Sequence, residues 1–474
     1  MQIPGDSLPP TQARRTSRAG VHELKQQYNI NKKVLGSGSF GKVFQAENKA
    51  DNSHHVAIKV IAKQKLSEQE ILALHQEVSI LQTLDHPNIV KYYETYEDEK
   101  FIYLVMELCP GGELFEKLSA NQTMNENLAA MAIERVLRAL IHCHRIGIVH
   151  RDIKPENIMY DKAGEVKLID FGLAKQTTGN QKLTTIAGTP YFIGPEVLNG
   201  SYGKECDIWS LGVLLYVLVT GTYPFDSATK NRAEVFQKIQ KGIITFPPNI
   251  EGKLTPECKD LIRKMIVVDR SKRVSGEQAL SHAWFEKCLQ RKEGTQDLIE
   301  EGVLMRLRQF KGSSTLKKAA LNVLVKMLSP NDVENLRDLF QKIDTDNSGF
   351  IEIQELEKAL MDNHHQIGAQ ELKKIIEELD YNGNSLINYT EFLAATISVQ
   401  KFLTHQKLEA IFRQFDIDGN NQITKENIRD AMTKMGREIS EEEINEIMRK
   451  HDSSGDQAIS LDEFKKMIMD DTDE

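Results

Sequence analysis

The sequence predicts an α+β domain followed by an all-α domain, and three observations carry this prediction. Short β-rich runs such as VAIKVIA and FIYLVME follow Tyr28, and longer apolar helical patterns continue to about Phe285. Nearer the carboxyl end, polar loops recur every 36 residues and open with Asp344, Asp380, Asp416 and Asp452. The charge divides similarly, since 37 acidic and 44 basic residues precede Asn331, whereas 32 acidic and 16 basic residues lie from Asn331 onward. We therefore expect a mildly basic first domain and an acidic second one built from four repeats.

The cysteines and apolar runs are typical of a cytosolic protein. The five cysteines are scattered and have no metal-like spacing, which favours reduced thiols over disulfides. The longest apolar run, IWSLGVLLYVLV, is well short of the roughly 20 residues that span a bilayer. MQIPGDS at the start has neither an apolar signal core nor a glycine at position 2. We expect a cytoplasmic protein without a transmembrane segment or lipid anchor, and disorder over the polar residues 1–27.

GSGSFGKV, from Gly36 to Val43, has the form GxGxxGxV, a turn whose backbone can approach nucleotide phosphates because no side chains intervene. The same glycines also mark dinucleotide-binding folds, so the context decides. VAIK places Lys59 on a following strand, and HQEVSIL offers Glu77 on a helix as its ion-pair partner. A dinucleotide fold would instead need an acidic residue about 20 positions further on, closing a βαβ unit. The lysine and glutamate favour a phosphotransferase.

HRDIKPEN and DFG then follow in the order that phosphoryl transfer requires. The chemistry needs a base for the attacking hydroxyl, metal ligands, and cations on the phosphates. We expect Asp152 to accept the hydroxyl proton, and Asn157 and Asp170 to hold Mg²⁺. Lys59 would anchor the α- and β-phosphates of ATP, and Lys154 would steady the γ-phosphate. Each charged residue alone is usually a solvated surface group, but five motifs in this order indicate a catalytic site.

Together with GTPYFIGPE and DIWSLGV, these motifs resemble the eukaryotic protein kinase family over about residues 28–285. The resemblance implies a bilobal α+β kinase fold with an ion pair between Glu196 and Arg273. Lys154 favours serine and threonine over tyrosine substrates, and Glu113 with Glu156 resembles the acidic pair that selects basic residues upstream of the target. The residues that the resemblance places around ATP are Leu35, Gly36, Ser37, Gly38, Ser39, Phe40, Gly41, Lys42, Val43, Ala57, Lys59, Glu77, Glu107, Cys109 and Glu113.

Two hydroxyl residues are candidate phosphorylation sites. Thr185 precedes IAGTP and resembles the activation-loop site of calmodulin-kinase relatives, and Arg151 could receive its phosphate. The alternative for Thr185 is an ordinary polar loop. In the tail, ARRTS puts two arginines ahead of Ser17, which is a candidate for autophosphorylation.

DTDNSGFIEIQE has the spacing of an EF-hand calcium loop. Such a loop needs oxygen ligands at positions 1, 3, 5 and 12, a backbone carbonyl at position 7, glycine at position 6 and an apolar residue at position 8. This segment meets every requirement, and its expected ligands are Asp344, Asp346, Ser348, Phe350 and Glu355.

The other three loops depart from this pattern. DYNGNSLINYTE has Ser385 at position 6 and DSSGDQAISLDE has Gln457 there, which should weaken binding severalfold because a non-glycine residue pays roughly 1 kcal/mol in the left-handed region. DIDGNNQITKEN has Asn427 at position 12 and loses the bidentate carboxylate, so we expect it to be the weakest or silent site. Isoleucine at position 8 of every loop would let the third pair with the fourth even when empty. The expected ligands are Asp380, Asn382, Asn384, Leu386 and Glu391 in the second loop, Asp452, Ser454, Asp456, Ala458 and Glu463 in the fourth, and weakly Asp416, Asp418, Asn420 and Gln422 in the third.

The stretch from Glu301 to Leu328 joins the two halves and alternates apolar with basic residues. Calcium-loaded EF-hand lobes clasp basic amphipathic helices of this kind, although an ordinary linker helix over a core is the alternative. The order of kinase domain, junction and four EF-hands resembles the calcium-dependent protein kinase family over nearly all of residues 28–474. The resemblance implies a switch in which calcium draws the junction away from the kinase site.

The expected divisions are a disordered extension (1–27), a kinase domain (28–285), an autoinhibitory junction (286–330) and EF-hands at 331–366, 367–402, 403–438 and 439–474. We expect a monomer that acts on protein substrates, binds ATP, Mg²⁺ and Ca²⁺, and does not bind nucleic acid. A calcium-binding scaffold with an inert kinase fold, and a constitutive kinase carrying a calcium buffer, are the rival hypotheses. Calcium dependence of phosphate transfer distinguishes all three.

Overall fold

A computed structural model of the chain describes most of the 474 residues. The described residues are 20–37, 41–51, 53–117, 123–177, 182–185, 187–289, 299, 301–311, 313–361, 369–379, 386–435 and 437–469. They form two compact units. The first comprises the described residues up to Val78 together with Tyr92–Leu108, and the second comprises Ser79–Lys91 together with the described residues from Cys109 onward.

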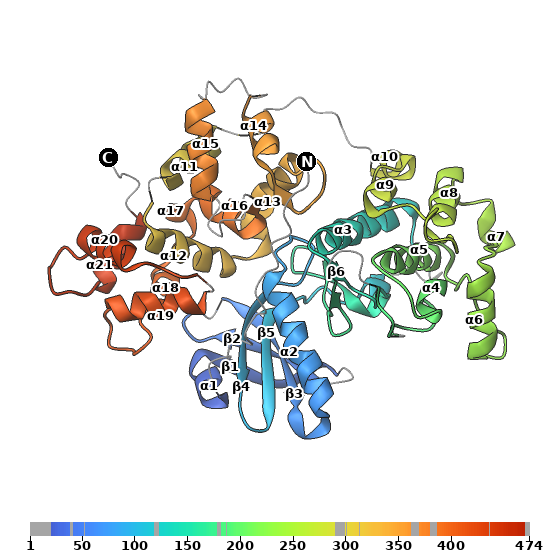
Figure 1. Ribbon diagram of the computed structural model, residues 1–474, viewed down its shortest axis with the longest axis horizontal. Coiled ribbons are helices and arrows are strands. Elements are labelled where there is room, and N and C mark those ends of the chain that lie inside the picture. Colours follow the sequence, from blue (N-terminus) through green and yellow to red (C-terminus); the bar gives the residue numbers. More distant parts are fainter. Residues whose placement is uncertain are drawn as a thin grey trace. The chain divides into compact units, whose positions relative to one another are not determined.

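The first unit is built on a five-stranded antiparallel sheet with the order β1-β2-β3-β5-β4 (Figure 1). β-branched and aromatic residues alternate along the central strands, so one face buries Val56, Ile58 and Val105 in a common core. The elements of this region are α1 (Val21–Gln27), β1 (Tyr28–Ser37), β2 (Gly41–Asn48), β3 (His55–Ala62), the 3₁₀ turn η1 (Lys63–Lys65), α2 (Glu68–Thr83), β4 (Tyr92–Glu97) and β5 (Phe101–Glu107).

The expected disorder up to residue 27 is wrong for its last part, because α1 is an ordered helix. Leu24 is fully buried in the core of the sheet. Tyr28 is buried too, and its hydroxyl donates to Glu94 Oε1 at 2.6 Å. One leucine in a seven-residue helix is too little for a periodic signal, yet burying it contributes about 2 kcal/mol.

The kinase-like part of the second unit is mostly helical. Its central helix α5 is apolar on every side and almost wholly buried, and it packs against α3 and α8. The elements here are η2 (Leu114–Lys117), α3 (Glu126–Arg145), β6 (Ile148–Val149), η3 (Pro155–Asn157), β7 (Ile158–Tyr160), β8 (Val166–Leu168), β9 (Lys175–Gln176), α4 (Pro195–Leu198), α5 (Glu205–Thr220), α6 (Arg232–Lys241), α7 (Pro248–Glu251), α8 (Pro256–Met265), α9 (Gly276–Leu280) and α10 (Ala283–Leu289).

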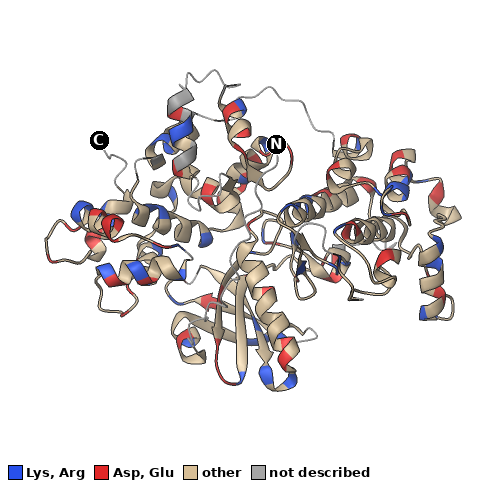
Figure 2. Ribbon diagram, in the orientation of Figure 1, with Lys and Arg blue, Asp and Glu red and all other residues tan. Residues whose placement is uncertain are grey.

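The remainder of the second unit consists of short amphipathic helices around polar loops, and acidic residues recur along it (Figure 2). Loops pair through short antiparallel bridges, Ile351 with Ile387 and Ile423 with Ile459, which confirms the predicted role of position 8. The elements are α11 (Glu301–Lys311), α12 (Thr315–Lys326), η4 (Pro330–Val333), α13 (Glu334–Ile343), β10 (Phe350–Ile351), α14 (Ile353–Met361), α15 (Ala369–Leu379), β11 (Ile387–Asn388), α16 (Tyr389–Thr396), α17 (Val399–Phe402), α18 (His405–Phe415), α19 (Lys425–Lys434), α20 (Glu441–His451) and α21 (Leu461–Met469).

The junction forms two helices, α11 and α12, where the sequence suggested one. Ser314 caps α12 by accepting a hydrogen bond from the backbone N–H of Lys317, which fixes a new helix start. α12 packs against α16, α18, α20 and α21, so both EF-hand pairs contact it. Its leucines share one core with the EF-hand helices, as Leu316 and Leu324 are fully buried there.

All five cysteines, which the sequence led us to expect as reduced thiols, are buried and free. None of the helices within the described ranges combines the length and apolarity that crossing a bilayer requires.

The packing of α12 predicts that Leu324→Ala destabilises the EF-hand region by about 2–5 kcal/mol, because a buried leucine leaves a cavity. Hydrogen exchange of the α16 amides measures this as a lower free energy of opening. Met305→Ala is the control, since Met305 is exposed on α11 and its loss should change that free energy by less than about 0.5 kcal/mol. Equal effects of the two substitutions would contradict the packing of α12.

Candidate functional site

The first unit places Lys59 and Glu77 together, as predicted. Lys59 lies in the middle of β3, paired with Val43 on one side and Leu104 on the other. Its Nζ is 3.1 Å from Oε1 of Glu77 on α2, and both side chains are largely shielded from water. The sheet and α2 therefore hold a lysine in one position with its charge partly balanced, as an anchor for phosphates requires.

The glycine-rich turn is described only at its two ends, and Gly38, Ser39 and Phe40 lie outside the described residues. Among the described residues, no atom lies within 4 Å of a Cβ placed on Gly36, whereas a Cβ on Gly41 would lie 2.2 Å from the carbonyl oxygen of Val60. Gly41 is thus required by the close approach of β2 to β3, and the described residues leave room beside Gly36. Both observations suit a backbone that a phosphate group can approach.

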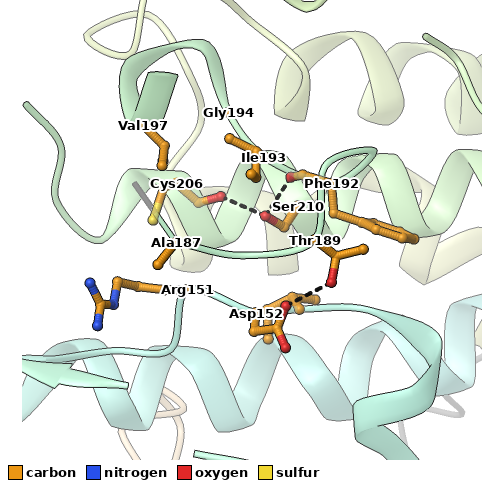
Figure 3. Close-up of a pocket in the computed structure, with 11 residues that line it drawn as sticks. Arg151, Asp152, Ala187, Thr189, Phe192, Ile193, Gly194, Val197, Cys206 and Ser210 are labelled. Atoms are coloured by element: carbon orange, nitrogen blue, oxygen red, sulfur yellow. Dashed lines mark hydrogen bonds between the residues drawn. The ribbon is translucent and has the colours of Figure 1, made fainter. Parts of the chain in front are cut away.

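In the second unit, Asp152 lies at the centre of a hydrogen-bond cluster. Its Oδ2 accepts from Lys154 Nζ at 2.6 Å and from Asn157 Nδ2 at 3.0 Å. Its Oδ1 accepts from the hydroxyl of Thr189 at 3.0 Å, and Figure 3 shows these two side chains pointing toward each other beside a small pocket. Nδ2 of Asn157 faces Asp152. The amide oxygen Oδ1 of Asn157 therefore points the other way and can serve as a metal ligand.

The catalytic loop is fixed by Asp207, a residue whose role the sequence reasoning missed. Asp207 is fully buried near the start of α5 and accepts from the backbone N–H groups of His150, at 2.9 Å, and Arg151, at 2.8 Å. His144 Nε2 lies 2.7 Å from Oδ2 of Asp207, the oxygen that also accepts from His150. Burial acts to raise the pKa of Asp207, but these hydrogen bonds and the nearby histidines hold it below its ordinary value. The signal was present, since Asp207 opens the DIWSLGV motif.

Arg151 adopts a left-handed backbone conformation, with φ of 70°, next to Asp152. Its guanidinium donates to the carbonyl of Leu173 at 2.6 Å and to the hydroxyl of Tyr202 at 3.0 Å. That hydroxyl in turn donates to the carbonyl of Thr185 at 2.6 Å. Thr185 is exposed and connected to Arg151 through one side chain, so the cation predicted to receive its phosphate lies nearby.

Three further observations concern residues that the sequence analysis named. Glu196 and Arg273 form a buried bidentate pair, with contacts of 2.5 and 2.9 Å, and confirm the ion pair that the kinase resemblance implied. Asp170 Oδ1 accepts from the backbone N–H of Gly172 at 3.0 Å, which orients that carboxylate. Burial and the negative charges of Glu116 and Glu156 raise the pKa of Glu113, consistent with an acidic pair beside the catalytic loop.

The first EF-hand loop assembles a carboxylate cage. One oxygen from each of Asp344, Asp346 and Glu355 lies within 4.8 Å of the others. Glu355 reaches across the loop, because its Oε1 accepts from the backbone N–H of Thr345 at 2.7 Å while its Oε2 accepts from that of Glu352 at 3.0 Å. Burial, together with the charges of Glu355 and Asp346, raises the pKa of Asp344 to about 7. Clustered carboxylates that repel one another in this way fit a divalent cation with oxygen ligands.

The fourth loop closes in the same manner and the third does not. Glu463 Oε1 accepts from the backbone N–H groups of Ser453 and Ser454, each at 2.9 Å, and its Oε2 accepts from that of Ser460. Asn427 makes only the near contact, accepting from the backbone N–H of Thr424 at 3.1 Å. The shorter amide caps α19 but cannot span the loop, which agrees with the third loop being the weakest site.

Position 6 adopts the left-handed conformation in each loop where it is described. The φ angles are 76° at Gly349, 62° at Asn421 and 67° at Gln457. The predicted strain at Gln457 is therefore present, while asparagine tolerates this region better. In the second loop, Asp380, Asn382, Asn384 and Ser385 lie outside the described residues, and Glu391 caps α16 by accepting from the backbone N–H of Asn388.

Comparisons with known proteins agree with this arrangement. Residues 28–285 match the protein kinase domain, and residues 333–397 and 405–469 each match an EF-hand domain pair. Calcium-dependent protein kinase 4 of Arabidopsis thaliana is 36% identical over 355 residues, 74% of this chain and 70% of the relative. The chain belongs to the calcium-dependent protein kinase family. This confirms the resemblance and the predicted fold class, a bilobal kinase fold followed by helical EF-hands.

Two other relatives are similarly distant. Calcium-dependent protein kinase 5 of Plasmodium falciparum is 36% identical over 347 residues, 73% of this chain and 60% of the relative. Calcium-dependent protein kinase 14 of Arabidopsis thaliana is 39% identical over 340 residues, 71% of this chain and 63% of the relative. The chain thus matches between three fifths and seven tenths of the length of these relatives. A kinase domain implies ATP and a divalent metal, and EF-hands imply Ca²⁺.

The geometry of position 12 predicts that Asn427→Glu adds calcium affinity to the third loop. A glutamate could cap α19 with one oxygen and reach the far side of the loop with the other, as Glu463 does. Calcium titration of the full chain should show one additional site, or one tightened at least tenfold. Glu426→Gln, one position earlier, is the control and should leave the titration unchanged, whereas equal titrations for Asn427→Glu and the parent chain would contradict the argument.

Proposed function

We propose that this protein is a calcium-activated serine/threonine kinase that transfers the γ-phosphoryl group of ATP to protein substrates. The observation that carries the proposal is the coexistence, in one chain, of an oriented catalytic aspartate and an assembled carboxylate cage. Asp152 receives hydrogen bonds from three side chains, and the carboxylates of the first EF-hand loop gather within 4.8 Å. A calcium-binding scaffold with an inert kinase fold would need the carboxylate cage but not the oriented aspartate, so Asp152 is what favours a kinase over that scaffold.

The chain's own residues suit the parts of phosphoryl transfer. When bound, MgATP supplies the phosphoryl group and the metal charge that offsets its oxygens. Asp152 Oδ1 would accept the proton of the substrate hydroxyl, since it already accepts a hydrogen bond from the hydroxyl of Thr189 at 3.0 Å. Lys154 would steady the transferred group, and Asn157 with Asp170 would hold Mg²⁺.

The remaining predicted residues would bind ATP or select the protein substrate. Lys59, paired with Glu77, would anchor the phosphates of ATP beside the glycine-rich turn. Burial and the negative charges of Glu116 and Glu156 raise the pKa of Glu113. A basic residue upstream of the target would offset these negative charges, which supports the proposed preference for such substrates. The buried, free cysteines suit a cytoplasmic protein, and we propose that it acts there as a monomer.

Regulation would pass through the junction. Basic side chains of α11 and α12 pair with the EF-hand region, Arg308 with Glu371 and Lys318 with Glu378, and the leucines of both helices are buried among the EF-hand helices. Helices held in this way are unavailable to the catalytic loop, so calcium would activate the kinase by favouring this packing. At low calcium, released basic helices could occupy the place of a basic substrate.

A phosphate-transfer assay with a peptide that carries arginines before a serine tests this function. We expect transfer with calcium chloride, little transfer with a chelator, and at least a hundredfold loss in Asp152→Asn because the proton acceptor is gone. Asp260→Asn, an exposed carboxylate in a surface ion pair, is the matched control and should retain activity. Equal rates with and without calcium would indicate a constitutive kinase, and no transfer in either condition would indicate an inert fold.

Phosphorylation of Thr185 is a second part of the proposal, with Ser17 as a further autophosphorylation site outside the described residues. A phosphate on Thr185 would form charge-assisted hydrogen bonds with the nearby guanidinium of Arg151. Protein made in bacteria and incubated with MgATP should therefore be about tenfold less active as Thr185→Ala than as Thr184→Ala. Full activity of Thr185→Ala would mean that Thr185 belongs to an ordinary polar loop.

A further inference from the structure

One face of α3, in the kinase domain, lies directly against the first EF-hand loop. Arg138, His142 and Arg145 are spaced four and three positions apart and so point from the same side of the helix. Arg138 Nη1 donates to Oδ1 of Asn347, at loop position 4. His142 Nδ1 lies 3.1 Å from the carbonyl oxygen of Ser348, at position 5. The kinase domain therefore contacts the backbone and side chains of a calcium loop.

Arg145 bridges two acidic residues of that loop. Its Nη1 pairs with Oδ2 of Asp346, at position 3, and its Nη2 pairs with Oε1 of Glu352, at position 9. Asp346 turns its other oxygen, Oδ1, into the loop, where it accepts from the backbone N–H of Ser348 at 3.0 Å. The guanidinium thus holds the outer oxygen of a predicted calcium ligand and leaves the inner oxygen facing the cage.

Gly349 makes the contact close. A Cβ on this residue would lie 2.4 Å from Nδ1 of His142 and 2.8 Å from Cδ2 of His86. The ring of Phe350 packs 4.8 Å from that of His142, which is fully buried. Asn421 and Gln457 occupy the same loop position elsewhere and carry side chains with the same left-handed φ. The left-handed turn therefore tolerates residues other than glycine. At position 349, the close packing against His142 and His86 is what excludes a side chain.

Further contacts extend this interface beyond the loop, to α16 of the second EF-hand and to α13 of the first. Asp85 accepts from the backbone N–H and the hydroxyl of Thr390, both at 2.9 Å, at the start of α16. Arg135 donates to Gln341 at 3.0 Å, and Arg337 lies 3.4 Å from Glu165. Paired and hydrogen-bonded charges of this kind give an interface one defined arrangement.

We propose that α3 forms the outer shell of the first calcium site, with Arg145 as a positioning residue, so that calcium binding and docking of this loop on the kinase domain strengthen each other. The inference rests on the proposed function, since it takes this loop to bind calcium. Groups that hold the outer atoms of metal ligands fix their orientation and raise affinity, and here they come from another domain. Linkage requires that calcium tighten the docking by the same factor by which docking tightens calcium binding.

Calcium titration of Arg145→Ala tests the first half of the inference. The full chain would carry Asp380→Asn, Asp416→Asn and Asp452→Asn, so that only the first loop keeps its opening carboxylate. With calcium chloride alone, we expect Arg145→Ala to bind about three- to tenfold more weakly than the parent. Lys264→Ala is the control, because it removes the same charge from a kinase-domain ion pair with Asp260. An unchanged or tighter affinity in Arg145→Ala would overturn the inference.

An engineered disulfide tests the second half. Asp85→Cys with Thr390→Cys replaces two short side chains that are hydrogen-bonded at 2.9 Å, and the native cysteines are buried and should not compete. We expect this disulfide to form severalfold faster with calcium than with a chelator, as measured by gel mobility under mild oxidation. A rate that ignores calcium would contradict the linkage.

Gly349→Asn separates docking from loop geometry. Asparagine adopts this turn at Asn421, but at position 349 its side chain would strike His142 and His86. The variant should slow disulfide formation in calcium to the rate seen with chelator, and a rate equal to that of the parent would overturn the inference. Failure of the parent loop to bind calcium at all would instead count against the proposed function, so the two failures are distinguishable.

Discussion

The hydrogen bonds of the buried Asp207 carboxylate with the catalytic loop are the interaction on which the kinase site depends. An unpaired charge at this depth would cost several kcal/mol, and the chain offsets that cost by aiming two consecutive backbone N–H groups and His144 at it. Those two N–H groups belong to the catalytic loop, so satisfying the charge also fixes the path of the loop. Arg151, which contributes one of these N–H groups, has the left-handed backbone conformation and directly precedes Asp152.

In the calcium loops, a single side chain at position 12 has to make two separate contacts. The residue at position 12 caps the following helix and also spans to the opening of the loop. Glu355 and Glu463 are long enough for both, and Asn427 satisfies only the cap. The third loop therefore keeps its structural place, bridged to the fourth through Ile423 and Ile459, while losing the atom that most favours a divalent ion.

Much of this was predictable from the sequence because it depends on residue type at fixed spacing. The pair of Lys59 with Glu77, the pair of Glu196 with Arg273 and the isoleucine bridges all follow from such patterns. The helix α1 did not, because one buried leucine leaves no period to detect. The contacts of Arg138 and Arg145 with the first calcium loop were not predictable for a different reason. Charged residues on a helix are usually solvated, and only the folded chain brings the loop, about 200 residues later, against α3.

Because α12 is buried among the EF-hand helices, the folded EF-hand domain begins before the first sequence repeat. Repeats in the sequence start with the helix before the first loop, but the leucines of α12 are interior residues of the same core. If the residues before the first repeat were removed, the apolar side chains of the EF-hand helices that pack against α12 would be exposed. Such an apolar surface could contact solvent or a second copy of the chain. The two junction helices therefore belong to the core of the EF-hand domain, with α12 at its centre, and are not merely a tether between two domains.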